Sequence, residues 1–304
     1  MGMTDNQKRL VRAVAENKFE DARKCAIACC EEDQTQKNAN FAQHYKQMLE
    51  TAPTLIELPA NLNGIVQMED ISKSFLEGRY YIKEEEKQLF DQIMRMRKVS
   101  KKMQEMKIPY ANTTLLYGES GTGKTMFGRY VAYKTGLPFC YLKFSYLIDS
   151  YMGNTSKNIA RVFEYAKTAP CVLMLDELDC ISLVRSKGGA DNASSEMARI
   201  TIGIMQELDQ ITNNMIVIAA TNRYDRIDDA IKRRFSVHHE MKRFDHDDLD
   251  HMLRQYLDDV GITMPREVIE SIANQKKGQA ESINCLIREI AERLEKCQDT
   301  RKEN

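Results

Sequence analysis

Short apolar stretches alternate with segments of helical periodicity through the middle of the chain. The apolar stretches predict strands over residues 113–117, 139–143, 171–175 and 215–220. The intervening segments, where apolar residues recur every three or four positions, predict helices over residues 125–135, 155–168 and 194–208. Strands and helices that alternate in this way form a parallel sheet with helices on both faces. We therefore predict an α/β fold for this part of the chain.

The flanking segments carry helical patterns without strands. Helical spacing within 1–51 predicts a small N-terminal helical region, and the same spacing within 242–304 predicts a C-terminal helical region. Proline, asparagine and glycine punctuate residues 52–75, so we expect a linker there. A long helix is expected from residue 84 to about 107, acidic at its start and basic at its end, as the helix dipole favours. The α/β domain is therefore assigned to 76–241.

Composition narrows the choice of partners and compartment. The 44 Lys and Arg residues nearly balance the 45 Asp and Glu residues, which gives a net charge of −1. We therefore expect neither a nucleic-acid partner nor a membrane partner. The eight cysteines show no paired C-x-x-C pattern, which indicates free thiols in a reducing compartment. No signal peptide and no apolar run of about 18 residues is evident, so we expect a cytoplasmic protein.

A glycine-rich motif lies between the first predicted strand of this domain and the helix that follows. It fits G-x-x-x-x-G-K-[ST], a pattern that wraps backbone N–H groups around phosphates and places a lysine at the β- and γ-phosphates. The predicted ATP-binding residues are Gly118, Glu119, Ser120, Gly121, Thr122, Gly123, Lys124, Thr125 and Met126. The threonine hydroxyl suits Mg²⁺, and the N-terminal end of the helix adds positive potential. This motif predicts a P-loop nucleoside triphosphatase that binds ATP and Mg²⁺.

Two acidic residues follow the third predicted strand of the domain. The apolar run 172–175 ends in Asp176 and Glu177, about fifty residues after the glycine-rich motif. A buried parallel strand delivers both side chains to the carboxyl edge of the sheet, beside the phosphates. We predict that Asp176 holds Mg²⁺ together with Thr125, and that Glu177 is the general base for the attacking water.

Residues from about 113 to 234 resemble the nucleotide-binding domain of the AAA family of ring-forming ATPases. The strand 216–220 and the Thr-Asn-Arg that follows are similar to the family's sensor-1 segment, which implies that Asn222 positions water near the γ-phosphate. The Arg-Arg-Phe at residues 233–235 resembles the arginine-finger segment, most closely that of the subgroup containing spastin and katanin. This resemblance implies that Arg233 and Arg234 act in the ATP site of a neighbouring subunit.

The same resemblance implies a substrate-gripping loop and a lid. Tyr151, Met152 and Gly153 match the aromatic–hydrophobic–glycine pattern of the family's first pore loop, which grips an extended polypeptide. Residues 278–282 occupy the place where related ATPases carry a sensor-2 arginine, and this chain has no arginine there. Residues 80–82 are expected to line the adenine pocket.

The function that these features imply is an ATP-hydrolysing ring motor. We expect a homo-oligomer, a hexamer, that remodels or unfolds a protein substrate by threading it through a central pore, with a partner recruited by the N-terminal helices. Two alternatives stay open from the sequence: an ATPase that helps reactions on nucleic acid, and a nucleotide-gated assembly scaffold. Salt-sensitive DNA binding would favour the first, and negligible turnover in the assembled ring would favour the second.

Overall fold

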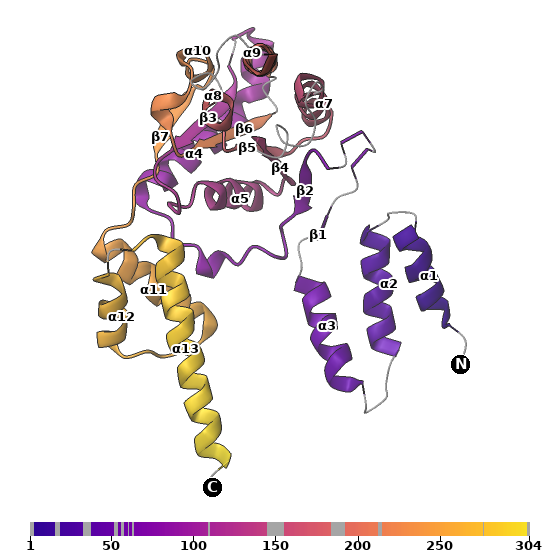
Figure 1. Ribbon diagram of the computed structural model, residues 1–304, viewed down its shortest axis with the longest axis vertical. Helices are drawn as coiled ribbons and strands as arrows, with labels where there is room; N and C mark the ends of the chain where they lie inside the picture. Colours follow the sequence, from indigo (N-terminus) through magenta and orange to yellow (C-terminus); the bar gives the residue numbers. More distant parts are fainter. Residues whose placement is uncertain are drawn as a thin grey trace.

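The computed structural model describes most of the chain (Figure 1). The described residues are 3–15, 19–32, 38–51, 54–55, 58–59, 61–62, 64–108, 110–144, 155–183, 192–211, 215–275 and 277–302. Within them lie a mixed sheet, helices on both of its faces, a C-terminal group of helices and a separate N-terminal group. The α/β class predicted from the sequence is confirmed.

Seven described strands form one sheet in the order β1-β2-β4-β5-β6-β3-β7. The strands are β1 (Thr54–Leu55), β2 (Gln67–Asp70), β3 (Asn112–Tyr117), β4 (Phe139–Lys143), β5 (Val172–Asp176), β6 (Ile216–Thr221) and β7 (Val237–Glu240). The five strands from β4 to β7 in this order are parallel, whereas β2 pairs antiparallel with β4 and β1 antiparallel with β2. The four predicted strands are present within one residue of their expected ends.

The edge of the sheet differs from the sequence-based expectation. Residues 52–75 were expected to form a linker, yet β1 and β2 lie there, and β2 extends the sheet beside β4. Val66, Met68 and Ile71 are buried in the core. Part of this segment therefore belongs to the sheet, and the antiparallel pairing at this edge is also a departure from an all-parallel sheet.

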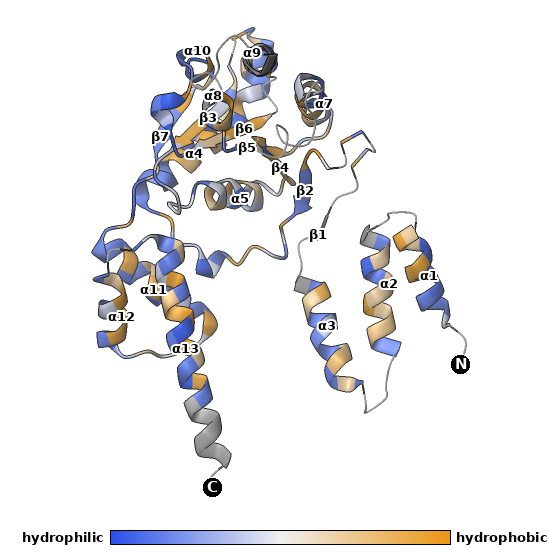
Figure 2. Cartoon of the chain, viewed as in Figure 1, coloured by the Kyte–Doolittle hydropathy of each residue, from blue (hydrophilic) through white to orange (hydrophobic). Residues whose placement is uncertain are grey.

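Side chains alternate between the two faces of the sheet because successive residues of a strand point in opposite directions. On β3, Leu115 packs with α7 (Thr155–Thr168) and α9 (Asn192–Asp209), whereas Leu116 packs with α4 (Glu84–Glu105) and α5 (Lys124–Thr135). Leu173 and Met174 divide in the same way on β5. Helices therefore cover both faces, as predicted, and Figure 2 shows the strands between them as largely hydrophobic.

The lid consists of α11 (His246–Val260), α12 (Arg266–Ala273) and α13 (Gln279–Lys302). These helices share a core of their own, which includes Leu249, Leu253, Ile269 and Leu286. Both ends of α11 are well defined, by a capping box at Asp245 and by a left-handed glycine after its last turn. The short elements η1 (Glu77–Arg79), α8 (Cys180–Leu183), η2 (Tyr224–Arg226) and α10 (Asp229–Lys232) complete this part of the chain.

Three helices form the N-terminal region, as the periodicity predicts. They are α1 (Asp5–Ala15), α2 (Phe19–Glu32) and α3 (Ala39–Thr51); α1 packs on α2, and α2 packs on α3 (Figure 1). No helix in the described ranges is both long and apolar enough to cross a lipid bilayer.

Candidate functional site

The loop between β3 and α5 has a backbone that only glycine can adopt comfortably. Gly118, Gly121 and Gly123 have φ angles of 145°, 79° and 89°, in the region that side chains disfavour. A Cβ atom on Gly118 would lie 2.2 Å from the carbonyl oxygen of Met241, which follows β7. This close approach explains why the first residue of the motif is a glycine.

Lys124 is the first residue of α5, and its side chain turns back into the loop. Its Nζ donates to the carbonyl oxygens of Gly118 at 2.8 Å and Glu119 at 2.7 Å. The side chain is buried, and this burial lowers the pKa of the ammonium group, although Asp176 and Asp179 oppose the shift. The arrangement places a desolvated positive charge inside a ring of backbone groups, which suits a phosphate.

Thr125 and Asp176 meet at the carboxyl edge of the sheet. The Thr125 hydroxyl donates to Asp176 Oδ2 at 2.8 Å, and the hydroxyl of Tyr141 on β4 donates to the same oxygen at 3.2 Å. Hydroxyl and carboxylate oxygens are the donors that Mg²⁺ prefers. The two residues predicted to hold the metal are therefore in contact, and their chemistry fits that ion.

Glu177 has an unusual backbone conformation for a residue with a side chain, with φ at 58°. Its N–H donates to Asp176 Oδ1 at 2.8 Å, which holds this turn after β5 in place. Its carboxylate forms an ion pair with Lys143, the last residue of β4, at 2.9 Å. The sequence pattern did not identify Lys143, whose only signal is its position at the end of a predicted strand.

A second residue missed from the sequence is Asp179, which is 9% exposed. Its Oδ1 accepts from the Thr221 hydroxyl at 2.8 Å and from the Asn222 backbone N–H at 3.3 Å. Asp179 therefore links the turn after β5 to the end of β6, and it fixes the backbone from which the Asn222 side chain extends. Its signal in the sequence is its place in the Asp-Glu-Leu-Asp run.

Several of the residues described above line a cavity of about 600 Å³. One part of its wall consists of Ser120 to Met126 of the loop and α5, together with Asp176, Glu177 and Asn222. Residues 79–83 and Glu86 form another part of its wall, and Gln279, Ala280, Ile283 and Asn284 of α13 a third. Tyr80, Tyr81 and Ile82, which were expected to line the adenine pocket, line this cavity.

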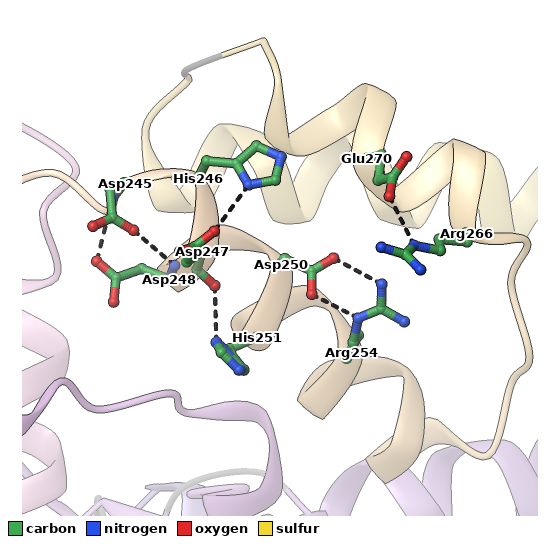
Figure 3. Close-up of polar contacts among 9 residues, drawn as sticks. All are labelled: Asp245, His246, Asp247, Asp248, Asp250, His251, Arg254, Arg266 and Glu270. Atoms are coloured by element: carbon green, nitrogen blue, oxygen red, sulfur yellow. Dashed lines mark hydrogen bonds and ion pairs between the residues drawn. The ribbon is translucent and has the colours of Figure 1, made fainter.

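The cavity wall at residues 79–83 is attached to the lid. Lys83 forms an ion pair with Asp248 at 2.6 Å, and the Tyr81 hydroxyl donates to Asp248 at 3.4 Å. Arg79 pairs with Asp259 at 2.7 Å, and Gln255 donates to backbone carbonyls in the same segment. Figure 3 shows how the start of α11 is organised around its acidic residues, with Asp245 capping the backbone of Asp248. Movement of α11 therefore moves this wall.

The two arginines of the Arg-Arg-Phe segment have different surroundings. Arg234 pairs with Asp209 at the end of α9, with both Nε–Oδ1 and Nη2–Oδ2 distances at 2.9 Å, and Nη1 donates to the Ala230 carbonyl. Arg233 is exposed and has no ion pair or side-chain hydrogen bond among the described residues. Neither arginine lines the cavity of its own chain. The predicted pore-loop residues Tyr151, Met152 and Gly153 lie outside the described residues.

Comparison with known proteins agrees with this geometry. Residues 114–243 match the family described as "ATPase family associated with various cellular activities (AAA)". The chain is 37% identical over 122 residues to a 26S proteasome regulatory subunit 8 homolog of Naegleria fowleri, and the aligned segment covers 39% of this chain and 30% of that protein. It is 39% identical over 122 residues to the peroxisomal ATPase PEX6 of Rattus norvegicus, which covers 39% of this chain and 12% of that protein.

An uncharacterised AAA family ATPase of Sinorhizobium fredii is 38% identical over 121 residues, covering 40% of this chain and 36% of that protein. The chain thus spans about a third or less of the length of these relatives. The glycine loop, the acidic residues after β5 and the family match all fall within the same segment. Residues 114–243 therefore match the AAA family of ATPases, and the cavity's glycine loop and acidic residues lie in that segment.

Proposed function

We propose that the chain is a ring-forming motor, a homohexamer, that uses ATP hydrolysis to remodel or unfold a protein substrate. The observation that carries this proposal is the placement of Arg233, an exposed arginine that lies outside the cavity of its own chain. Among the described residues, the cations that line that cavity are Arg79, Lys83 and Lys124, of which Arg79 and Lys83 are paired with lid carboxylates. An arginine supplied by a neighbouring subunit completes such a site.

The roles of the cavity residues follow from their positions. Lys124 and the backbone N–H groups of residues 118–125 bind the phosphates, and the lysine exchanges its carbonyl contacts for phosphate oxygens. Thr125 and Asp176 hold Mg²⁺, which when bound neutralises charge on the phosphates. Glu177 accepts the proton of the attacking water, and Asn222 orients that water through its amide.

The ion pair between Lys143 and Glu177 gives the base two states. A carboxylate paired with an ammonium group is a weaker proton acceptor, because the positive charge favours its ionised form. Glu177 is fully effective as a base only when its carboxylate turns from Lys143 toward the water. In the proposed motor, assembly and ATP binding produce this change.

Arg233 extends from the segment after α10, and in the proposed ring it reaches the γ-phosphate bound by the next subunit. Its guanidinium keeps its charge and offers a planar set of donors to phosphate oxygens. Arg234 is bound to Asp209, and we assign it a structural role, in which this pair holds α10 against α9. Hydrolysis in each subunit thus depends on contact with a neighbour.

The proposed substrate is a polypeptide. Tyr151 and Met152 suit this role because an aromatic ring and a flexible thioether pack on many sequences without selecting one. Two relatives are named as a proteasome regulatory subunit and a peroxisomal ATPase, which supports a role in protein handling. We place the action in the cytoplasm, with no nucleic-acid partner.

The N-terminal helices are the proposed site for a partner or adaptor. Phe41, Tyr45 and Met48 on α3 are 63%, 44% and 53% exposed, and they recur at positions i, i+4 and i+7, so they share one face. An exposed apolar face of this kind suits contact with another protein.

ATP turnover per chain, measured against protein concentration, tests the shared site. We expect specific activity to rise with concentration for the wild type, and Arg233→Ala to bind ATP without turning it over. Arg95→Ala, which removes an exposed arginine from α4, is the matched control and keeps full activity. A flat rate per chain together with a fully active Arg233→Ala would show that the site is complete within one chain.

Threading is tested separately with Tyr151→Ala. We expect this variant to hydrolyse ATP and to assemble normally, and to lose the ability to unfold a loosely folded protein that the wild type unfolds. Intact unfolding by the variant would show that this residue does not grip the substrate, and would remove the threading mechanism.

A further inference from the structure

A buried carboxyl group lies in the wall of the ATP cavity without a role in the hydrolysis chemistry. Glu86, in the first turn of α4, is 3% exposed, and its Oε2 has no hydrogen-bond partner among the described residues. Buried polar atoms are almost always paired, so an unpaired carboxyl oxygen beside a cavity indicates a group that a ligand completes.

Glu86 lines the cavity together with residues 79–83, the segment that directly precedes it in the chain. The glycine loop, Asp176 and Glu177 define the phosphate end. Glu86 instead accompanies Tyr80, Tyr81, Ile82 and other largely apolar side chains of this wall, including Phe244 and Met252. A flat heteroaromatic ring packs against such side chains, and a small number of polar groups then fix its orientation.

We infer that Glu86 reads the nucleobase by accepting a hydrogen bond from the 6-amino group of adenine. The inference rests on the proposed use of this cavity by ATP and adds the selection of the base. A carboxyl oxygen is an acceptor, and adenine presents an N–H donor at its position 6, whereas guanine and hypoxanthine present a carbonyl oxygen there. Two acceptors repel, so the same atom favours ATP and disfavours GTP and ITP.

The surroundings of Glu86 support this assignment. Burial is the main cause that raises the pKa of its carboxyl group, and Glu85 and Asp248 add to that effect, whereas a hydrogen bond from its own backbone and the charge of Lys83 oppose it. Tyr80 and Lys83 come from the preceding segment and Asp248 from α11, so the carboxyl group is enclosed by the cavity wall and the lid. The ionised carboxylate is acceptor-only, so the preference for a 6-amino group belongs to the ionised form; protonation would add an O–H donor that a 6-carbonyl group accepts.

The experiment compares ATP with purine riboside triphosphate, which lacks only the 6-amino group. Dissociation constants are measured by displacement of a fluorescent ADP analogue from the full-length chain, in the presence of Mg²⁺. For the wild type we expect ATP to bind about tenfold more tightly than purine riboside triphosphate, because the analogue leaves a buried acceptor unpaired. GTP is expected to bind at least as weakly as the analogue.

Variants locate the discrimination in one side chain. Glu86→Ala should reduce the ATP preference to less than about twofold, and Glu86→Gln, which keeps an acceptor oxygen, should retain most of it. Glu84→Ala is the matched control, since Glu84 is an exposed glutamate in the same turn, and it should keep the wild-type preference.

The outcomes separate this inference from the proposed function. A wild-type protein that binds the two nucleotides equally overturns the base-reading role, whatever the variants do and whether or not they fold. A Glu86→Ala variant that keeps the tenfold preference overturns that role as well. If neither nucleotide binds, both the role of Glu86 and the assignment of the cavity to ATP fail. If binding is selective for ATP but turnover per chain does not rise with protein concentration, the role of Glu86 stands and only the shared site is removed.

Discussion

Arg234→Ala and Arg233→Ala should affect different properties of the protein, although the two residues are adjacent. Replacing Arg234 removes the bidentate pair with Asp209 and the hydrogen bond to the Ala230 carbonyl. The Arg234 side chain is 29% exposed and that of Asp209 is 54% exposed, so solvent screens the ion pair. We assign about 0.5–1 kcal/mol to that pair and about 1 kcal/mol to the hydrogen bond, a total loss of about 2 kcal/mol.

Arg233→Ala removes an exposed side chain that has no ion pair or side-chain hydrogen bond among the described residues, so the free energy of unfolding should change by less than about 0.5 kcal/mol. If Arg233 acts in the neighbouring ATP site, its loss should lower kcat about 10³-fold or more, as for other arginine fingers. That factor corresponds to about 4 kcal/mol of transition-state stabilisation. The two variants therefore separate stability from turnover.

The assay combines urea unfolding with steady-state ATP turnover at a protein concentration that saturates assembly. Arg234→Ala should unfold at lower urea and keep some turnover at low temperature, and Arg233→Ala should unfold like the wild type and be inactive. Normal turnover by Arg233→Ala, with an inactive but fully stable Arg234→Ala, would refute the assignment drawn from the Asp209 pair.

Three further predictions concern backbone and titration. Gly118→Ala should cost about 1–3 kcal/mol of stability and weaken ATP binding, measured by calorimetry, because its Cβ meets the Met241 carbonyl at 2.2 Å and φ is 145°. Lys107 follows α4 with φ at 55°, a conformation that glycine adopts without strain, so Lys107→Gly should stabilise the fold by about 0.5–1 kcal/mol and raise the melting temperature. The control Lys101→Gly lies inside the helix and should destabilise the fold by a similar amount. Burial lowers the pKa of His239, so the stability that this neutral side chain contributes should be fully present above about pH 6.5 and should decline as pH falls through the lowered pKa. Urea unfolding should therefore show that His239→Gln loses less stability than the wild type between pH 8 and pH 5.5. An equal loss in the two proteins would contradict this.

The strands that could be predicted are those with continuous apolar stretches. β5 and β6 lie in the centre of the sheet with both faces covered, so burial requires apolar residues at nearly every position. β2 and β7 lie toward the edges, and their sequences Gln-Met-Glu-Asp and Val-His-His-Glu carry too few apolar residues to show the pattern. Their place depends on pairing with β4 and β3, which are distant in the sequence.

The phosphate end of the site could be predicted because its chemistry is encoded locally. The glycines that adopt positive φ and the lysine stand at a fixed spacing in one short segment, and the acidic pair directly ends a continuous apolar strand about fifty residues later. Lys143, Asp179 and Glu86 could not be predicted in the same way, because their roles come from partners or burial that only the tertiary structure supplies. A glutamate in an acidic helix start, for example, is ordinarily a solvated residue that favours the helix dipole.

The central claim, that catalysis is shared between subunits, is tested most directly by mixing two inactive variants. Glu177→Gln lacks the base but keeps Arg233, whereas Arg233→Ala keeps the base but lacks the arginine that serves its neighbour. One complete site forms where an Arg233→Ala subunit, which supplies Glu177, lies beside a Glu177→Gln subunit that supplies Arg233 to that site. In an equal, random mixture that occurs at about a quarter of the sites, so we predict about a quarter of wild-type turnover. A mixture that stays as inactive as its components, although both variants bind ATP and co-assemble, would contradict the shared site.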